Sequence, residues 1–277
     1  MYFVWMFHPR SRIKSYCLAI LVVPLVFSAA AMAQNAASTA AASQPHWITP
    51  LVTFTPLLEQ EYRFDFDADS LAGGAMENYG GGKGLELIPW ARTEVVIGEP
   101  GYQAAHAPGR PSGWGDLDAA VKFRLAAAPP GRGNYVATVF LSATAPTGTA
   151  GVGLGVASFT PGIGLGKGWR RWDVQTTIAA TYFHGRAGTL GTPVAWNTAL
   201  QYHAGRYAWP QMEFSPQWWA GGLRQGQVQM VLTPGVVFGK IPLAGRMGLT
   251  LGIGEEFAAT AVAPFRRRLI FSLRLPF

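Results

Sequence analysis

The chain has 277 residues, of which 49% are hydrophobic, 13% are charged and 34 are glycine. This composition excludes a disordered acidic tail, and the charged fraction is about half that of a typical soluble protein. A helical membrane protein is also excluded, because it needs several apolar runs of about 20 residues and the sequence has one candidate, at its start. We therefore expect one domain built from short elements.

The first residues have the order of a secretory signal peptide. A basic region at residues 10–14 precedes an apolar run at 17–30, and Ala31-Met32-Ala33 matches an A-x-A cleavage site. We predict that residues 1–33 are removed after Ala33. Retention as a membrane anchor is the alternative, which the short apolar run and its small final residues disfavour.

Removal of this segment changes the charge and the thiol content. The net charge falls from +7 to +4, and Cys17, the single cysteine, is lost. Disulfides, thiolate metal sites and cysteine nucleophiles are therefore excluded from the mature chain. The basic residues are scattered rather than striped, so we expect no nucleic acid partner, and no motif predicts a cofactor or a metal.

The segment after the cleavage site contains little that could pack. Residues 34–46 are rich in Ala, Ser, Gln and Asn. We predict a flexible periplasmic lead-in over residues 34–56, too short and too polar to form a substantial plug, followed by a β-barrel domain over residues 57–277.

Alternation of apolar and polar residues at period two fills most of the mature chain. It is clearest at residues 268–277, where the odd positions are apolar and the even positions include Arg268, Ser272 and Arg274. This period predicts strands with two different faces. The many glycines and prolines disfavour helices, so we predict an all-β protein.

Three features favour a transmembrane antiparallel up-and-down β-barrel over a soluble sandwich. The chain ends on Phe277 within an alternating strand, as many outer-membrane barrels do for recognition by their assembly machinery. Several predicted strands have about 10 to 12 residues, enough to cross an outer membrane. Aromatic residues recur at strand ends, as interfacial belts require: Trp90, Trp114, Trp169, Trp172, Trp196, Tyr202, Trp209, Trp218 and Trp219.

The pattern predicts twelve strands, at 59–67, 82–87, 90–97, 116–125, 134–145, 154–165, 172–183, 193–203, 208–219, 227–238, 246–257 and 267–277. In this assignment the polar segments 68–83 and 98–115 face outward, and tight turns such as 205–206 face the periplasm. The strand at 82–87 is short, so ten strands, or twelve with a first strand near Leu51, stay open.

If the apolar face of each strand meets lipid, the charged face lines the interior. The register predicts a lumen lined by both charge signs, which favours cross-barrel salt bridges over a single-sign ion filter. The predicted lumen residues are Glu61, Arg63, Asp65, Asp67, Arg92, Glu94, Asp118, Lys122, Arg124, Asp173, Glu213, Glu256, Arg268 and Arg274.

No catalytic site is predicted. The histidines of the mature chain are His46, His106, His184 and His203, and none lies in a G-x-S-x-G, H-x-S or H-E-x-x-H setting or at metal-ligand spacing. A structural, hydrogen-bonded role is the preferred interpretation of His184 and His203.

Ordered motifs along the mature chain resemble a family of outer-membrane putative transporters grouped with the meta-pathway of phenol degradation. They are residues 58–61 (LEQE), 78–82 (NYGGG), 113–116 (GWGD), 146–148 (PTG), 166–169 (GKGW), 173–175 (DVQ), 195–198 (AWNT) and 232–235 (LTPG). The resemblance implies an outer-membrane barrel that admits small hydrophobic or aromatic compounds, and it implies no catalytic residue.

We therefore expect a bacterial outer-membrane protein whose partners are lipid, the assembly machinery and a small-molecule solute. The preferred function is passive passage of that solute through the barrel. The alternatives are a non-transporting structural barrel and, with less support, a lipid-modifying enzyme.

Overall fold

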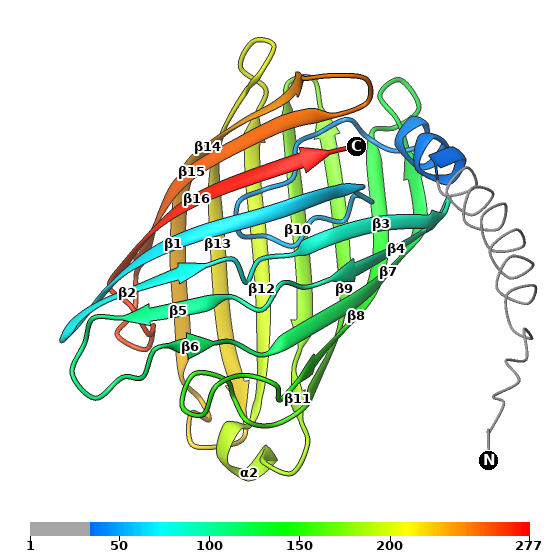
Figure 1. Cartoon of the computed structure of the whole chain (residues 1–277). Coiled ribbons are helices and arrows are strands. Elements are labelled where there is room, and N and C mark those ends of the chain that lie inside the picture. Colours follow the sequence, from blue (N-terminus) through cyan, green and yellow to red (C-terminus); the bar gives the residue numbers. More distant parts are fainter. Residues whose placement is uncertain (1–33) are drawn as a thin grey trace, which may run out of the picture.

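The computed structural model describes residues 34–277, and the predicted signal peptide and its cleavage site lie outside the described residues. The described chain forms one antiparallel β-barrel of twelve wall positions (Figure 1). The barrel closes where β1 pairs with β16 over ten residue pairs, from Glu61 opposite Pro276 to Ser70 opposite Arg267. The predicted all-β, twelve-strand barrel is therefore confirmed.

The wall follows the order of the sequence, and four of its twelve positions each contain two strands: β2 with β3, β4 with β5, β6 with β7, and β10 with β11. β2 and β3 both pair with β1, β5 and β4 pair with them in turn, and β6 and β7 follow. The strands are β1 (Glu61–Leu71), β2 (Gly74–Tyr79), β3 (Gly84–Trp90), β4 (Thr93–Ile97), β5 (Tyr102–Ala105), β6 (Gly113–Trp114), β7 (Leu117–Ala128), β8 (Tyr135–Ala145), β9 (Ser158–Trp169), β10 (Trp172–Ala180), β11 (Tyr182–Phe183), β12 (Thr192–Tyr202), β13 (Ala208–Ala220), β14 (Val228–Pro242), β15 (Gly248–Ala258) and β16 (Arg267–Pro276).

Segments 68–83 and 98–115, predicted as outward loops, contain parts of four wall strands. Most of 68–83 belongs to the end of β1 and to β2, and 98–115 contains β5 and β6. Glycines interrupt the strands between these pieces. A Cβ at Gly101 would lie 2.9 Å from the Cα of Gly81. The backbones at these two glycines therefore pack directly against each other, with no room for a side chain between them.

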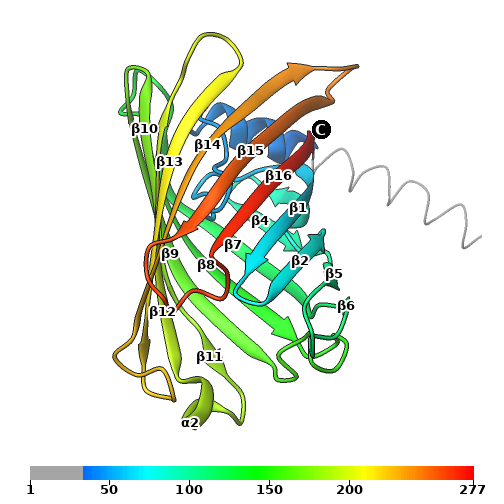
Figure 2. The same ribbon diagram turned by 90° about the vertical axis from the view of Figure 1, so that its left-hand side faces the viewer.

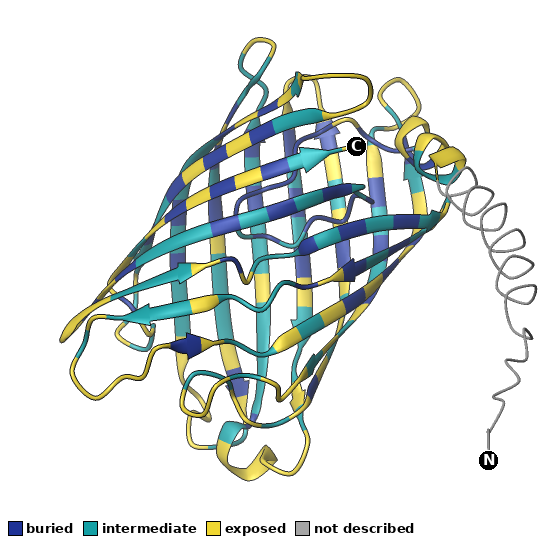
Figure 3. Ribbon diagram, viewed as in Figure 1, coloured by how far each residue is buried: buried dark blue, intermediate teal, exposed yellow. Residues whose placement is uncertain are grey.

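Burial alternates along the strands and separates an apolar outer face from a polar inner face (Figure 3). The outer face exposes large apolar side chains, including Phe123, Ile163 and Phe271. Two of the residues predicted for the aromatic belts differ, because Trp209 and Trp219 are buried on the inner face. Trp209 is adjacent to the exposed Pro210, and Trp219 is adjacent to the exposed Trp218. Because neighbouring residues of a strand point to opposite faces, strand position and not residue type decides that these two rings point inward.

The two ends of the barrel carry connections of different length. At the end that holds the C-terminus and helical residues 34–42, turns are short, such as 91–92 and 170–171 (Figure 2). The opposite end carries the longer connections, including 146–157 and a segment with the short helix α2 (Ala187–Leu190). No helix within residues 34–277 is long and apolar enough to cross a membrane.

Candidate functional site: the lumen and its N-terminal segment

The most prominent feature of the lumen is residues 44–58, here called the lumen segment. They run inside the barrel without regular secondary structure before the chain enters β1 (Figure 1). Leu51, Leu57 and Leu58 are at most 2% exposed, and Trp47 and Ile48 are buried as well. The structure therefore differs from the prediction of a flexible lead-in, because this segment packs within the barrel wall and fills part of the lumen.

Backbone groups of the lumen segment are satisfied by side chains of the wall, since the segment has no strand partner. The Glu213 carboxylate on β13 accepts hydrogen bonds from the amides of Leu51 (2.8 Å), Val52 (2.9 Å) and Thr53 (2.6 Å). The side-chain amide of Gln211 donates to the same carboxylate at 2.7 Å. One carboxylate thus pairs three consecutive amides, those of Leu51 and Thr53 being buried, that would otherwise be unpaired.

Arginines on β16 and β1 hold the carbonyls of the same stretch. Arg274 on β16 donates to the carbonyl oxygens of Thr49 (2.5 Å) and Pro50 (2.8 Å). Arg63 on β1 donates to Pro50 at 3.4 Å and to the carbonyl of Leu51. The segment is therefore held between a carboxylate and two guanidinium groups, each matched to the polarity of the backbone group it meets.

Gln175, on β10, contacts the segment at two points. Its side-chain amide donates to the carbonyl of Ile48 at 2.9 Å, and its oxygen accepts from the Thr55 hydroxyl at 2.6 Å. A row of amides continues from it across β12 and β13 through Gln201 and Gln211. This row connects the segment to the carboxylate of Glu213 through side chains of three adjacent wall positions.

Lys122 and Glu94 fix the last residues of the lumen segment. Lys122 donates to the carbonyl of Leu57 at 2.7 Å and lies 3.0 Å from a carboxylate oxygen of Glu94. Glu94 accepts a hydrogen bond from the amide of Glu59 at 2.6 Å. Both side chains are fully buried, and their hydrogen bonds to the backbone of residues 57 and 59 offset part of the cost of removing two charges from water.

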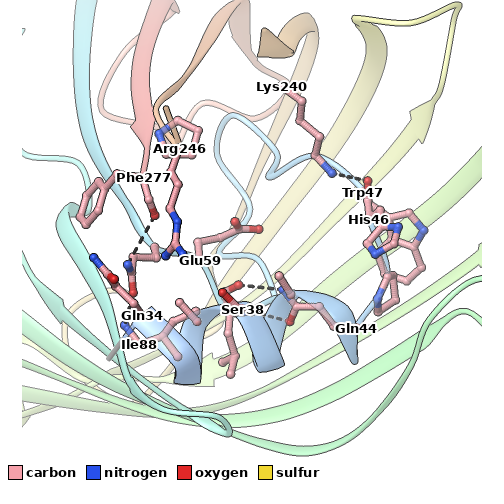
Figure 4. A pocket seen from close by; sticks show the side chains of 16 residues that line it. Gln34, Ser38, Gln44, His46, Trp47, Glu59, Ile88, Lys240, Arg246 and Phe277 are labelled. Atoms are coloured by element: carbon pink, nitrogen blue, oxygen red, sulfur yellow. Dashed lines mark hydrogen bonds between the residues drawn. The ribbon is translucent and has the colours of Figure 1, made fainter. Parts of the chain in front are cut away.

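Arg124 and Gln44 attach the start of the segment to the barrel end. Arg124 donates to the carbonyl of Ala40 (2.9 Å) and to Gln44 (3.1 Å), while Gln44 exchanges two hydrogen bonds with the backbone of Leu58. A cavity of about 300 Å³ lies beside this attachment (Figure 4). Burial raises the pKa of Glu59, which lines this cavity together with Lys240.

Glycines on the inner face make room for the segment. A Cβ at Gly166 would lie 2.5 Å from the Trp47 ring, and a Cβ at Gly252 would lie 2.4 Å from a methyl group of Leu51. The same holds for Gly239 against Ile48. The alternating glycines of β9, β14 and β15 therefore accommodate the apolar side chains of the lumen segment.

Two further cavities, of about 190 and 270 Å³, share Asp67 and Arg268 in their walls. Arg268 is paired with Asp69 at 2.6 Å and with Glu256 at 3.3 Å. The smaller cavity is also lined by apolar side chains of the lumen segment, including Phe54. Its lining therefore offers a small molecule both charged and apolar contacts.

The structure places thirteen of the fourteen predicted lumen residues in buried or half-buried inward positions. Asp67, Asp118 and Arg268 are half-buried; the buried ones are Glu61, Arg63, Asp65, Glu94, Lys122, Arg124, Asp173, Glu213, Glu256 and Arg274. Arg92 differs from its predicted position. It is exposed in the turn 91–92, donates to the carbonyl of Arg124 at 2.9 Å and lies 5.1 Å from the Phe123 ring centroid on the outer face.

Several inward polar residues were not predicted. Asp69 lies two residues after Asp67 on the same face of β1, but the predicted strand ended at residue 67 and did not include it. Glu86 lies opposite Glu61 on β3, in the strand whose existence was least certain from the sequence. Gln175 and Gln211 carry no charge, and a search for charged residues alone overlooks them.

The histidines do not form a common site. His203 stacks on Trp209, with ring centroids 4.4 Å apart, and His106 lies 3.7 Å from Glu77. Within residues 34–277, no three His, Cys, Asp or Glu side chains are placed to hold a metal ion.

The sequence matches no model of a known protein family and no curated protein. Among solved structures, the chain is similar to an outer membrane channel from Pseudomonas putida F1, with a TM-score of 0.52 and 14% identity over 83% of this chain and 100% of that one. It also matches the NanC porin, with a TM-score of 0.49 and 7% identity over 77% of this chain and 98% of that one. The first similarity establishes the barrel fold that this chain shares with a solved structure.

Proposed function

We propose that the mature chain is an outer-membrane channel that lets small solutes cross passively, with the lumen segment as its constriction. The observation that carries this proposal is the closed wall with an apolar outer face and a charged inner face. Such a wall suits hydrocarbon, because closure pairs the backbone of both edge strands and leaves only side chains towards lipid. The solved structure of similar fold is itself described as an outer membrane channel.

The exposed aromatic residues support membrane insertion. Trp90, Tyr135, Trp169 and Trp172 are exposed near the end that holds the C-terminus, and Tyr102, Trp114 and Tyr182 lie towards the other end. Two such groups on one barrel match the positions of the two membrane interfaces.

The solutes that we propose are small molecules with a hydrogen-bonding group and an apolar or aromatic part, phenol-like compounds included. The mixed lining of the cavity between Phe54, Asp67 and Arg268 supports this class. The resemblance of the sequence motifs to those of the phenol meta-pathway family points in the same direction. We assign no catalytic role to the lumen.

Swelling of proteoliposomes in phenol-like, fatty and sugar-like solutes tests this proposal. We expect passage of the phenol-like solute above that of protein-free vesicles, and we expect Asp67→Asn to change the ranking of solutes. Glu255→Gln, which alters an outward carboxylate, is the matched control and keeps the ranking. A correctly inserted barrel that passes none of the solutes would contradict the proposal.

A structural barrel without transport is the second candidate, and the dense hydrogen bonding of the lumen segment favours it. The two candidates differ in one respect. A channel conducts more when the segment is removed or loosened, whereas a purely structural barrel loses stability and gains no selective passage.

A further inference from the structure

An unpaired basic surface lies at the end of the barrel that holds the C-terminus. We call it the basic rim patch, and it consists of Arg132, Lys167, Arg170, Arg171 and Arg206. All five residues are exposed, and they belong to the connections 129–134, 170–171 and 203–207 and to the end of β9. These connections are neighbours because β8, β9, β10 and β12 pair in that order.

The patch has no acidic counterpart. Within residues 34–277, no Asp or Glu forms an ion pair with any of its five residues. The acidic residue nearest in sequence, Asp173, is buried on the inner face. Five positive charges are therefore presented together to whatever surrounds this end of the barrel.

Aromatic rings lie directly next to these charges. Trp169 and Trp172 are cross-strand partners that flank Arg170 and Arg171, and both rings are exposed on the outer face. The Trp172 ring lies 4.8 Å from that of Tyr202. Amphipathic rings with long basic side chains beyond them are typical of the level where lipid headgroups meet water.

The backbone of Arg170 gives an independent indication. Its φ is +57°, in the left-handed region that glycine adopts freely and that most L-residues disfavour. A glycine would fit this turn without strain, so the local backbone does not explain an arginine here. Strained positions of this kind are typical of functional contacts.

We propose that the basic rim patch binds the phosphate groups of anionic phospholipids in the leaflet at this end of the barrel. Guanidinium groups pair with phosphate oxygens in two-point contacts, and the flanking tryptophans place the arginines at headgroup depth. This inference rests on the membrane insertion in the proposed function. Free phosphate is an alternative occupant that the experiment separates.

Native mass spectrometry of the mature protein, released from nanodiscs of equal phosphatidylglycerol and phosphatidylcholine, tests the inference. We expect the wild type to retain phosphatidylglycerol in at least about fivefold excess, the effect of one basic residue near an anionic surface. The Arg170→Gln, Arg171→Gln double variant loses most of this excess. Arg246→Gln, at the same end but outside the patch, keeps it.

Two further measurements identify the origin of any change. Arg170→Gly removes the charge while relieving the backbone, so a loss of preference in this variant does not come from misfolding. Added inorganic phosphate leaves the lipid bound if the headgroup in its bilayer is the ligand, and displacement by phosphate overturns the lipid assignment. Equal retention of both lipids by an inserted wild type overturns the inference alone, whereas a chain that does not insert refutes the proposed function.

Discussion

Glu213 is the residue on which the position of the lumen segment depends most. Its carboxylate accepts three consecutive backbone amides, and it is fully buried in doing so. A charged acceptor strengthens each of these hydrogen bonds, and its removal leaves three donors unpaired, two of them buried.

Glu213→Ala is expected to loosen the segment locally by about 3 kcal/mol, because buried amides lose a charged acceptor. Hydrogen exchange at Leu51, Val52 and Thr53 measures this as an acceleration of about a hundredfold. Glu255→Ala is the matched control, since Glu255 pairs at 3.7 Å with Arg267 and touches no residue of the segment. Unchanged exchange in Glu213→Ala would show that other contacts hold the segment.

Gly252 tests the steric fit of the segment. Gly252→Val places side-chain atoms where Leu51 packs, and the overpacking is expected to cost about 1 to 3 kcal/mol. Adding Leu51→Ala to this variant removes the clash and restores part of the stability. Urea unfolding of the wild type, both single variants and the double variant measures the coupling, and strictly additive effects would contradict the contact.

The inward residues could be predicted because successive side chains of a strand point to opposite faces, so one inward residue identifies the others on that strand. The lumen segment could not. Residues 47–58 have no period, and their partners Gln175, Glu213 and Arg274 are distant in the sequence. The glycines of β9 and β15 are visible in the sequence, but only the structure shows what they accommodate.

At the scale of the elements, closure through β1 and β16 is the property that makes a barrel of the sheet. Long strands such as β8 (predicted 134–145, observed Tyr135–Ala145) were predicted closely, because their residues alternate between the apolar outer face and the polar inner face. β9 begins four residues later than predicted. The short strands β2, β5 and β6 were missed, β3 was predicted a few residues too early and β4 was predicted too long, because the pairing of these glycine-interrupted strands is decided by their neighbours.

Closure predicts a specific cross-link. Residues 34–277 contain no cysteine, so the Phe66→Cys, Phe271→Cys variant of this part of the chain contains one pair, at directly opposite positions of β1 and β16. Oxidation is expected to form a disulfide that keeps the first and last strands together on heated gels. Phe66→Cys with Ile163→Cys, two outward positions on strands that do not pair, is the control and forms none. Failure of the first pair to cross-link would place β1 and β16 apart.

At the scale of the whole molecule, three layers follow one another from outside to inside. An apolar outer face surrounds a charged inner face, and that face surrounds a segment whose backbone it satisfies. The outer two layers could be predicted from the sequence, and the third could not. In the channel that we propose, permeability depends on how the segment lies in the lumen.

Single-channel conductance in planar bilayers, recorded for the mature wild type and for a variant lacking residues 34–58, tests this account most directly. Glu213→Ala serves as a second variant that loosens the segment without shortening the chain. We predict a small conductance for the wild type and a several-fold larger one for both variants. Inserted barrels that stay closed to ions in all three forms would contradict the account.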